Sequence, residues 1–244
     1  MTLILAIRAK DGIVMASDGQ ATEVGGDQPT KLTTQKIFPV HKNALWGGAG
    51  DGGAIDEVKL LIDALQPSKA GNHSTLCEAF TEKIFQVNHP RWERFRKMGL
   101  PSSKDPTATA LMVQYEGDVP HIVEFEIHGA ACKYDKHGYQ AIGSGSNLAR
   151  PWLREYYTND VDLDQARTLG YMTVQRVIET AALGVGPPID VWTLRKKSGS
   201  LIIEQASEES KNGLKDAVNV ISQLQKEVFT AYKIDRDKAA INAP

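Results

Sequence analysis

The sequence has few of the features that mark secreted or membrane proteins. Among its 244 residues there are only two cysteines, Cys77 and Cys132, which lie far apart and without CxxC spacing, so neither a disulfide framework nor a zinc site is expected. No segment reaches the roughly 18 apolar residues of a membrane span, and no charged stretch followed by a long apolar one opens the chain as in a signal peptide. We therefore expect a protein of the reducing cytoplasm.

An excess of charge of one sign is also absent. The 28 Lys and Arg residues nearly balance the 30 Asp and Glu residues, and no long run carries a single sign. A surface that binds nucleic acid or an anionic membrane is therefore not expected. The six histidines show no metal-ligand spacing such as HxxxH, so we predict no metal site and no cofactor and place these histidines on the surface or in loops.

The chain does contain short apolar runs that predict strands. Thr2–Ile7 and Ile13–Ser17 are separated by a polar stretch with an Asp-Gly pair, which favours a tight hairpin turn. Lys36–Val40 and Ala44–Gly48 repeat this pattern, so the first 48 residues are predicted to form an antiparallel meander. Later strands are predicted at 108–115, 121–127, 139–143, 189–194 and 201–204.

Helical spacing of apolar residues alternates with these strand blocks. It predicts helices at 55–65, at 76–87 behind a Thr75 to Glu78 capping box, at 147–157, at 163–181 behind Asp162 and Gln165, and at 214–228. Asn72-His73 and 101–105 are interpreted as surface loops, and the tail from Asp235 as frayed or as an interaction arm. The block order predicts an α+β fold with helices outside antiparallel sheets rather than a βαβ fold.

Thr2 stands directly behind Met1, a context in which methionine aminopeptidase commonly removes the methionine. Removal leaves an N-terminal threonine, which carries a hydroxyl nucleophile and an α-amine base on one residue. The amine titrates near about 7.7–8.0 in model peptides, so its proton-accepting form is accessible at cellular pH. Many proteins begin Met-Thr, however, so a catalytic interpretation needs supporting residues.

Three segments supply such support. Asp18 follows the second predicted strand, Lys36 begins the third, and a glycine-rich stretch from Gly47 ends the fourth, so an antiparallel meander can bring them beside the chain start. A lysine beside the threonine lowers the pKa of the hydroxyl and keeps the amine neutral, and an aspartate holds that lysine charged and in place. Each residue also has an ordinary interpretation, because aspartates often form turns at strand ends and lysines often lie at solvated edges.

Taken together, these segments resemble the proteasome β-type family of N-terminal nucleophile hydrolases, over roughly Thr2 to Leu194. The stretch from Asp18 to Thr22 is especially similar to the peptidase subunit of the bacterial two-component ATP-dependent protease, and the whole chain looks like a divergent bacterial proteasome homologue. The matching segments, in order, are Thr2, Lys10-Asp11-Gly12, Ala16-Ser17-Asp18, Gln35-Lys36-Ile37-Phe38, Gly47-Gly48-Ala49-Gly50-Asp51 and Ile142-Gly143-Ser144-Gly145-Ser146.

The resemblance implies a four-layer αββα sandwich with the active site at one end of two facing sheets. It further implies that Thr2 Oγ attacks a peptide carbonyl to form an acyl-enzyme, that Lys36 assists its deprotonation and that Asp18 pairs with Lys36. Ser144 would hydrogen-bond the terminal amine, and the N–H of Gly47 would stabilise the oxyanion. Residues 1–244 then form a single proteasome-β-like domain, extended by a C-terminal helix and tail at about 207–244.

The resemblance also implies how a substrate binds. The backbone around Thr22, Gly47 and Ala49 would pair with an extended peptide as an added strand. Ala21, Leu45 and Ala49 would line the primary specificity pocket, and their small, apolar character favours an uncharged side chain. A homo-oligomeric ring or stacked rings, a peptide or unfolded protein substrate and an ATPase unfoldase partner complete the expectation.

The late part of the chain departs from the family pattern. Proteasomal β subunits usually carry an Asp-Ser-x-Ser-Gly-like segment before the late strand, whereas this chain reads Glu-Thr-Ala-Ala-Leu-Gly-Val-Gly-Pro-Pro-Ile-Asp-Val at 179–191. The missing aspartate and serine leave the positioning of the amine to Thr180, Glu179, backbone or water, or else the activity is weak.

Three other functions are alternatives. Residues 48–53 satisfy GxGxxG and could suggest a dinucleotide site, but the hairpins around them lack the βαβ crossover that such a site needs. A non-catalytic ring subunit has no need of Thr2, Asp18 and Lys36 together. An amidase or transpeptidase of the same fold, acting on a restricted substrate, remains open.

Overall fold

The computed structural model describes residues 2–23, 30–99, 106–180 and 184–241. Contacts along the chain divide it into two compact units, Met1–Ala206 and Ser207–Pro244. The first unit holds all the strands and the helices α1 to α5, and the second holds the helix α6 (Glu208–Ile241). The interpretation of the C-terminal part as an extension of a single domain stays a prediction.

Two five-stranded antiparallel sheets form the centre of the first unit. The first sheet has the order β10-β1-β2-β11-β12, with strands β1 (Ile4–Arg8), β2 (Ile13–Asp18), β10 (Tyr139–Ile142), β11 (Ile189–Lys197) and β12 (Ser200–Gln205). The second has the order β5-β6-β7-β8-β9, with strands β5 (Ile37–Val40), β6 (Ala44–Gly50), β7 (Ala108–Glu116), β8 (Val119–Phe125) and β9 (Ala131–Lys133). The hairpins predicted from the apolar runs are therefore confirmed. The single antiparallel meander predicted for the first 48 residues was wrong, because β1 and β2 lie in the first sheet and β5 and β6 in the second.

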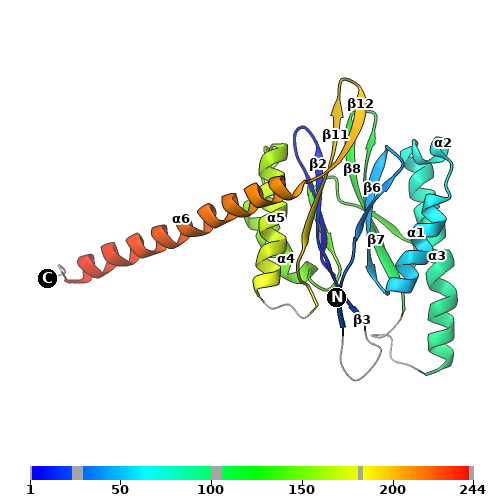
Figure 1. The fold of residues 1–244 in the computed structure, drawn as a ribbon, viewed down its shortest axis with the longest axis horizontal. Coiled ribbons are helices and arrows are strands. Elements are labelled where there is room, and N and C mark those ends of the chain that lie inside the picture. Colours follow the sequence, from blue (N-terminus) through cyan, green and yellow to red (C-terminus); the bar gives the residue numbers. More distant parts are fainter. Residues whose placement is uncertain (1, 24–29, 100–105, 181–183, 242–244) are drawn as a thin grey trace. The chain divides into compact units, whose positions relative to one another are not determined.

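Helices cover the outer face of each sheet. On the first sheet, α5 (Leu163–Glu179) contacts β1, β2 and β11, and α4 (Ser146–Tyr156) contacts β10. On the second, α1 (Gly52–Asp63) and α3 (His73–Lys97) contact β6 and β7, and the short α2 (Pro67–Ala70) contacts α3. Figure 1 shows the resulting order of helices, sheet, sheet and helices. This confirms the α+β class and the four-layer αββα sandwich.

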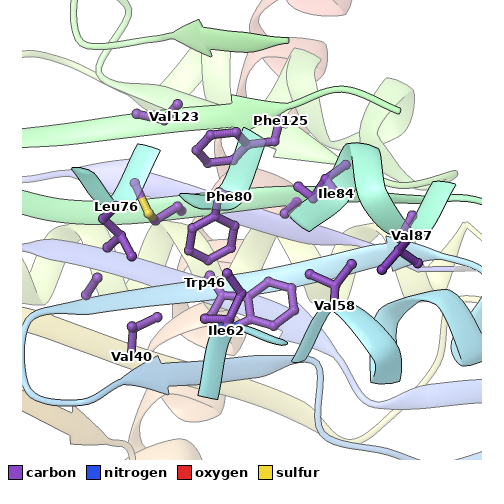
Figure 2. Packing of buried hydrophobic residues seen from close by; sticks show 14 of the residues in the cluster. Val40, Trp46, Val58, Ile62, Leu76, Phe80, Ile84, Val87, Val123 and Phe125 are labelled. Atoms are coloured by element: carbon purple, nitrogen blue, oxygen red, sulfur yellow. The ribbon is translucent and has the colours of Figure 1, made fainter. Parts of the chain in front are cut away.

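Successive side chains of β6 point alternately into two hydrophobic cores. Trp46 points toward the helices, where its ring lies 5.5 Å from that of Phe80, which in turn stacks on Phe125 at 5.1 Å (Figure 2). Leu45, one residue earlier, points to the opposite face and belongs to the core between the sheets, with Ile4, Ile37 and other apolar residues. Period-two alternation thus buries both faces of this strand.

The structure corrects three expectations. Helix α3 begins at His73, because Asn72 accepts a hydrogen bond from the N–H of Thr75 at 3.0 Å and so caps the helix one turn before the predicted capping box; Asn72-His73 is not a loop. His73 and His121 are buried and stacked on each other at 4.2 Å, so their placement on the surface was wrong. Helix α6 continues to Ile241, into the predicted frayed tail.

Other expectations fare differently. The Asp162 and Gln165 capping box of α5 is confirmed. A two-stranded sheet of β3 (Gln20–Glu23) and β4 (Thr30–Thr33) was not predicted, because the exposed residues of β4 give no apolar signal. The loop predicted at 101–105 lies outside the described residues. In the described part of the chain, no helix is long and apolar enough to cross a membrane.

Candidate active site

The beginning of the chain is held by two separate segments, the turn after β10 and the end of β2. On one side, the main-chain nitrogen of Thr2 donates a hydrogen bond to Ser144 Oγ at 3.2 Å, and the N–H of Gly145 donates to the Thr2 carbonyl at 3.1 Å. On the other side, the N–H of Leu3 donates to Asp18 Oδ1 at 2.8 Å, and the N–H of Asp18 donates to the Leu3 carbonyl at 3.2 Å. Thr2 is thereby fixed while its side chain stays partly exposed.

The turn after β10 is shaped around Thr2. Gly143 has a φ of +86°, which L residues rarely adopt, and a Cβ built on it would lie 2.3 Å from the carbonyl oxygen of Thr2. Only glycine therefore lets the chain approach Thr2 so closely. The next residue is Ser144, so this turn places the hydroxyl of Ser144 at the nitrogen of Thr2.

Asp18 is the centre of the site. Its side chain is fully buried, at 0% exposure, and both of its carboxylate oxygens accept hydrogen bonds. Oδ1 accepts from Leu3 N at 2.8 Å and from Lys36 Nζ at 2.7 Å. Oδ2 accepts from Gln20 N at 3.3 Å and from Gly186 N at 3.2 Å. These four donors supply the hydrogen bonds that water would otherwise make to this buried side chain.

Lys36 is buried beside Asp18, with 5% of its surface exposed. Its Nζ lies 2.7 Å from Asp18 Oδ1 and 2.7 Å from the carbonyl oxygen of Gln20, so two acceptors hold the ammonium. Burial lowers the pKa of Lys36, and the charge of Asp18 and the hydrogen bond to it act in the opposite direction. A buried lysine with a lowered pKa and one specific partner is typical of a functional site.

Because Leu3 N and Lys36 Nζ bind the same oxygen of Asp18, the lysine ammonium is held next to the main chain at Thr2. The structure thus brings together Thr2, Asp18, Lys36 and Ser144, which come from four separate segments of the chain. This arrangement can polarise a hydroxyl at the chain start.

Gly47 lies in the middle of the second sheet, facing the first. It pairs with Ile37 on β5 and with Leu111 on β7. A Cβ at Gly47 would lie 2.9 Å from Ile4 Cγ2 and 3.0 Å from the Lys36 carbonyl oxygen, so the glycine allows β6 to pack closely against the site. β5 begins at Ile37, and within the described residues no strand pairs with residues 48–50 on that side of β6.

The four residues expected to bind substrate fall in two places. Ala21 and Thr22 lie on β3, paired with Leu32 and Lys31, and Ala21 is partly exposed. Leu45 and Ala49 lie on β6 in the core between the sheets, at 0% and 3% exposure. Their roles as specificity residues stay predictions.

Sequence reasoning missed Gly186, whose N–H binds Asp18 from 168 residues away. No residue type pointed to it, because Gly186 takes part through its main-chain N–H, a group that every residue except proline carries. The candidates for amine positioning have other partners: the Thr180 hydroxyl donates to the Val177 carbonyl at 2.8 Å, and Glu179 accepts from Gln175 Nε2 at 2.8 Å. Residues 181–183 lie outside the described part of the chain.

Other features of the surface do not coincide with this site. A groove of about 830 Å³ lies along α4 and β10 and contains none of the residues discussed above; it is lined by residues that include Tyr134, Tyr139, Arg150 and Arg154. Within the described ranges, no group of three or more His, Cys, Asp and Glu residues could hold a metal ion.

The chain is similar to proteins of a known family. The family model described as "Proteasome subunit" matches residues 2–89 and 94–191. A proteasome β subunit of Stackebrandtia nassauensis is 24% identical over 196 residues, which are 77% of this chain and 66% of that subunit, so the chain spans just under two thirds of the length of this relative. A proteasome α subunit of Archaeoglobus fulgidus is 23% identical over 183 residues, which are 72% of this chain and 67% of that subunit.

A solved structure shows the same fold. Anbu, an ancestral β-subunit from Yersinia bercovieri, superposes with a TM-score of 0.72 at 18% identity, covering 93% of this chain and 96% of that one. At this identity the likeness concerns the fold alone. The family model covers more than half of the chain, and the relatives include both α and β subunits. The chain therefore belongs to the proteasome subunit family.

Proposed function

We propose that this chain is a threonine-type peptidase that cleaves peptide bonds through an acyl-enzyme on Thr2, after removal of Met1. One observation carries the proposal: a fully buried aspartate, Asp18, binds both the main chain at Leu3 and the ammonium of Lys36. A structural protein gains little from such a buried ion pair, since its desolvation offsets much of its attraction. Beside a potential nucleophile, the same ion pair can increase the acidity of the nucleophile's hydroxyl group.

In the proposed reaction the α-amine of Thr2 accepts the proton of its own Oγ, and the ammonium of Lys36 stabilises the alkoxide as it forms. Oγ then attacks the carbonyl carbon of the scissile bond. The oxyanion of the tetrahedral intermediate binds the N–H of Gly47, a contribution worth about 10²–10³ in rate in other enzymes. The C–N bond breaks, and the leaving amine takes the proton from the α-ammonium, which leaves an ester on Oγ.

Water completes the cycle. The α-amine accepts a proton from the water that attacks the ester, the C–O bond to Oγ breaks, and the Oγ proton is restored as the carboxylic acid leaves. Ser144 orients the amine throughout, because its Oγ lies 3.2 Å from the Thr2 nitrogen. Asp18 keeps Lys36 in its protonated form against the effect of burial.

The substrate is proposed to be an extended peptide or an unfolded protein. Within the described chain, β4 is the strand paired with β3, so the other edge of β3 can take an added strand. On β6, the residues beyond Gly47 lack a strand partner on the side of β5 within the described chain, so their main-chain groups can pair with a substrate as well. Ala21 and Ala49 are small, which favours an uncharged side chain in the primary pocket. Subunits of this kind are proposed to form a homo-oligomeric ring or stacked rings supplied by an ATPase unfoldase in the cytoplasm.

Two alternatives share this fold. An amidase or transpeptidase would use the same acyl-enzyme with a restricted substrate or a different acceptor. Two observations favour a catalytically weak scaffold subunit: the similarity to an α subunit and the absence of the Asp-Ser-x-Ser-Gly-like segment. The buried pair of Asp18 and Lys36 opposes the scaffold.

Labelling tests the proposal. Protein treated with an epoxyketone or a β-lactone should carry one adduct on Thr2, with Met1 absent, in peptide mass spectrometry. Thr2→Ala should abolish the adduct, whereas Thr158→Ala, a substitution at an exposed threonine far along the chain, should leave it unchanged. An adduct that persists in Thr2→Ala, or a wild-type protein that is never labelled, would contradict the proposal. Native mass measurement on the same sample checks the ring.

A further inference from the structure

The segment before β11, residues 184–188, lies directly against the end of β2. The N–H of Gly186 donates to Asp18 Oδ2 at 3.2 Å, and the carbonyl of Gly186 accepts from the N–H of Gly19 at 3.1 Å. β11 then continues the contact, with Ile189 paired to Asp18. Both main-chain groups of Gly186 are therefore used to hold Asp18 and its neighbour.

Two glycines make this approach possible. A Cβ on Gly19 would lie 2.7 Å from both the carbonyl oxygen and Cδ of Pro188. A Cβ on Gly186, which is itself buried, would lie 2.2 Å from Gln20 Oε1. Real Cβ atoms do not tolerate such distances, so a side chain at Gly19 forces the two segments apart, and one at Gly186 displaces the Gln20 side chain.

The same segment also contacts the other loop that holds the chain start. Val185 is buried, at 6% exposure. A Cβ built on Gly145 would lie 3.3 Å from Val185 Cγ2 and 3.0 Å from Leu3 Cβ, so Val185 packs beside the turn that carries Ser144. Residues 185 and 186 thus touch both the Asp18 side and the Ser144 side of Thr2.

We propose that Gly186 is a positioning residue for the reaction, whose main-chain N–H fixes the orientation of Asp18 in place of the missing late aspartate and serine. With Oδ2 bound to Gly186 N and Gln20 N, the other oxygen faces Leu3 N and Lys36 Nζ. The late segment therefore acts on the nucleophile through the backbone and through Asp18, without a functional side chain of its own. This inference rests on the proposed function.

The decisive variant is Gly19→Ala, which changes no charge and no hydrogen-bonding group but collides with the carbonyl of Pro188. The rate constant for acylation of Thr2 by a β-lactone should fall on the order of 10- to 100-fold, as misplaced catalytic groups typically cause. The saturation constant for the β-lactone should stay close to the wild-type value, because the variant misplaces the reacting group and not the surface that binds the inhibitor. A merely structural effect would change both constants.

The matched control is Gly213→Ala, since this glycine lies on α6 with no atom within 4 Å of a built Cβ. It should label at the wild-type rate and with the wild-type saturation constant. A milder pair adds a rescue: Gly186→Ala should be slowed, and the added substitution Gln20→Ala should restore the rate, because it removes the side-chain atoms that collide. If Gly19→Ala does not fold, the comparison of Gly186→Ala with the Gly186→Ala/Gln20→Ala double variant tests the positioning role.

The outcomes separate the two proposals. Wild-type protein that is not labelled at Thr2 refutes the proposed function; the position of Gly186 is then read from the hydrogen exchange of its amide, which should be strongly protected in Thr2→Ala. If wild-type protein is labelled and Gly19→Ala is labelled at the same rate, the positioning role is overturned. The positioning role is also overturned if adding Gln20→Ala to Gly186→Ala does not restore the labelling rate.

Discussion

The buried pair of Asp18 and Lys36 allows stability and catalysis to be separated experimentally. We consider Asp18→Asn, Lys36→Met and the double variant. In Asp18→Asn, Lys36 keeps a buried ammonium with no counter-charge from Asp18, and the new amide nitrogen faces donors, because Leu3 N, Gln20 N and Gly186 N all donate to this side chain. In Lys36→Met, the charge left without its cation belongs to Asp18, which has 0% exposure.

The expected cost follows from this burial. Removing one partner of a buried ion pair costs about 3–5 kcal/mol, because the other charge remains in a place without water. For a domain of this size each kcal/mol lowers the melting temperature by about 2–4 °C, so each single variant should melt about 6–20 °C below wild type. The double variant removes both charges and should be less destabilised than the sum of the singles by about 0.5–3 kcal/mol.

The assay is thermal unfolding at one fixed protein concentration, because an oligomer's melting temperature depends on concentration. The same samples are treated with a β-lactone, and labelling of Thr2 is followed by mass spectrometry. The double variant should melt above the temperature expected from the summed single variants, and its labelling should not recover. The reasoning is refuted if the single variants melt within about 2 °C of wild type, if the double variant is as unstable as the summed singles, or if it regains the wild-type labelling rate.

Two further predictions concern regions away from the site. Phe80→Ala should lower the unfolding free energy by about 3–5 kcal/mol, because its ring is fully buried between Trp46 and Phe125. Labelling of Thr2 well below the melting temperature should be unchanged. An equal loss of stability in Met98→Ala, at an exposed side chain, would contradict this prediction. Burial, followed by the charge of His121, lowers the pKa of His73 from 6.5, so the stability it contributes is complete above pH 6.5 and is lost as the pH falls. In urea titrations His73→Gln should lose less stability than wild type below that pH, whereas the exposed His128→Gln should follow wild type.

Much of the fold could be predicted from local patterns. The apolar runs of β1, β2, β5 and β6 and the capping box of α5 determine those elements with little help from the rest of the chain. The start of α3 was predicted one turn late because two capping signals compete there, and Asn72 uses its side chain first. β4 escaped prediction because its exposed residues carry no periodic signal.

The candidate site divides in the same way. Thr2, Asp18 and Lys36 could be singled out because each is a reactive or charged residue at the end of a predicted strand, whereas Ser144 was implied only by the resemblance to the proteasome family. The buried histidines were misplaced because a lone histidine gives no sign of its environment, which depends on the partner that stacks on it.

The sequence by itself determined which side chains are present near the chain start and that the chain forms layered sheets and helices, because these depend on residue type and short-range periodicity. Only the tertiary structure decided how Asp18 is held. The contact from Gly186 joins its main-chain N–H to the carboxylate of Asp18 across 168 residues. Its only trace in residue type is two glycines, Gly19 and Gly186, whose lack of a Cβ gives the two segments room to touch. Main-chain hydrogen bonds between distant segments are available to every residue, so packing alone selects which of them form.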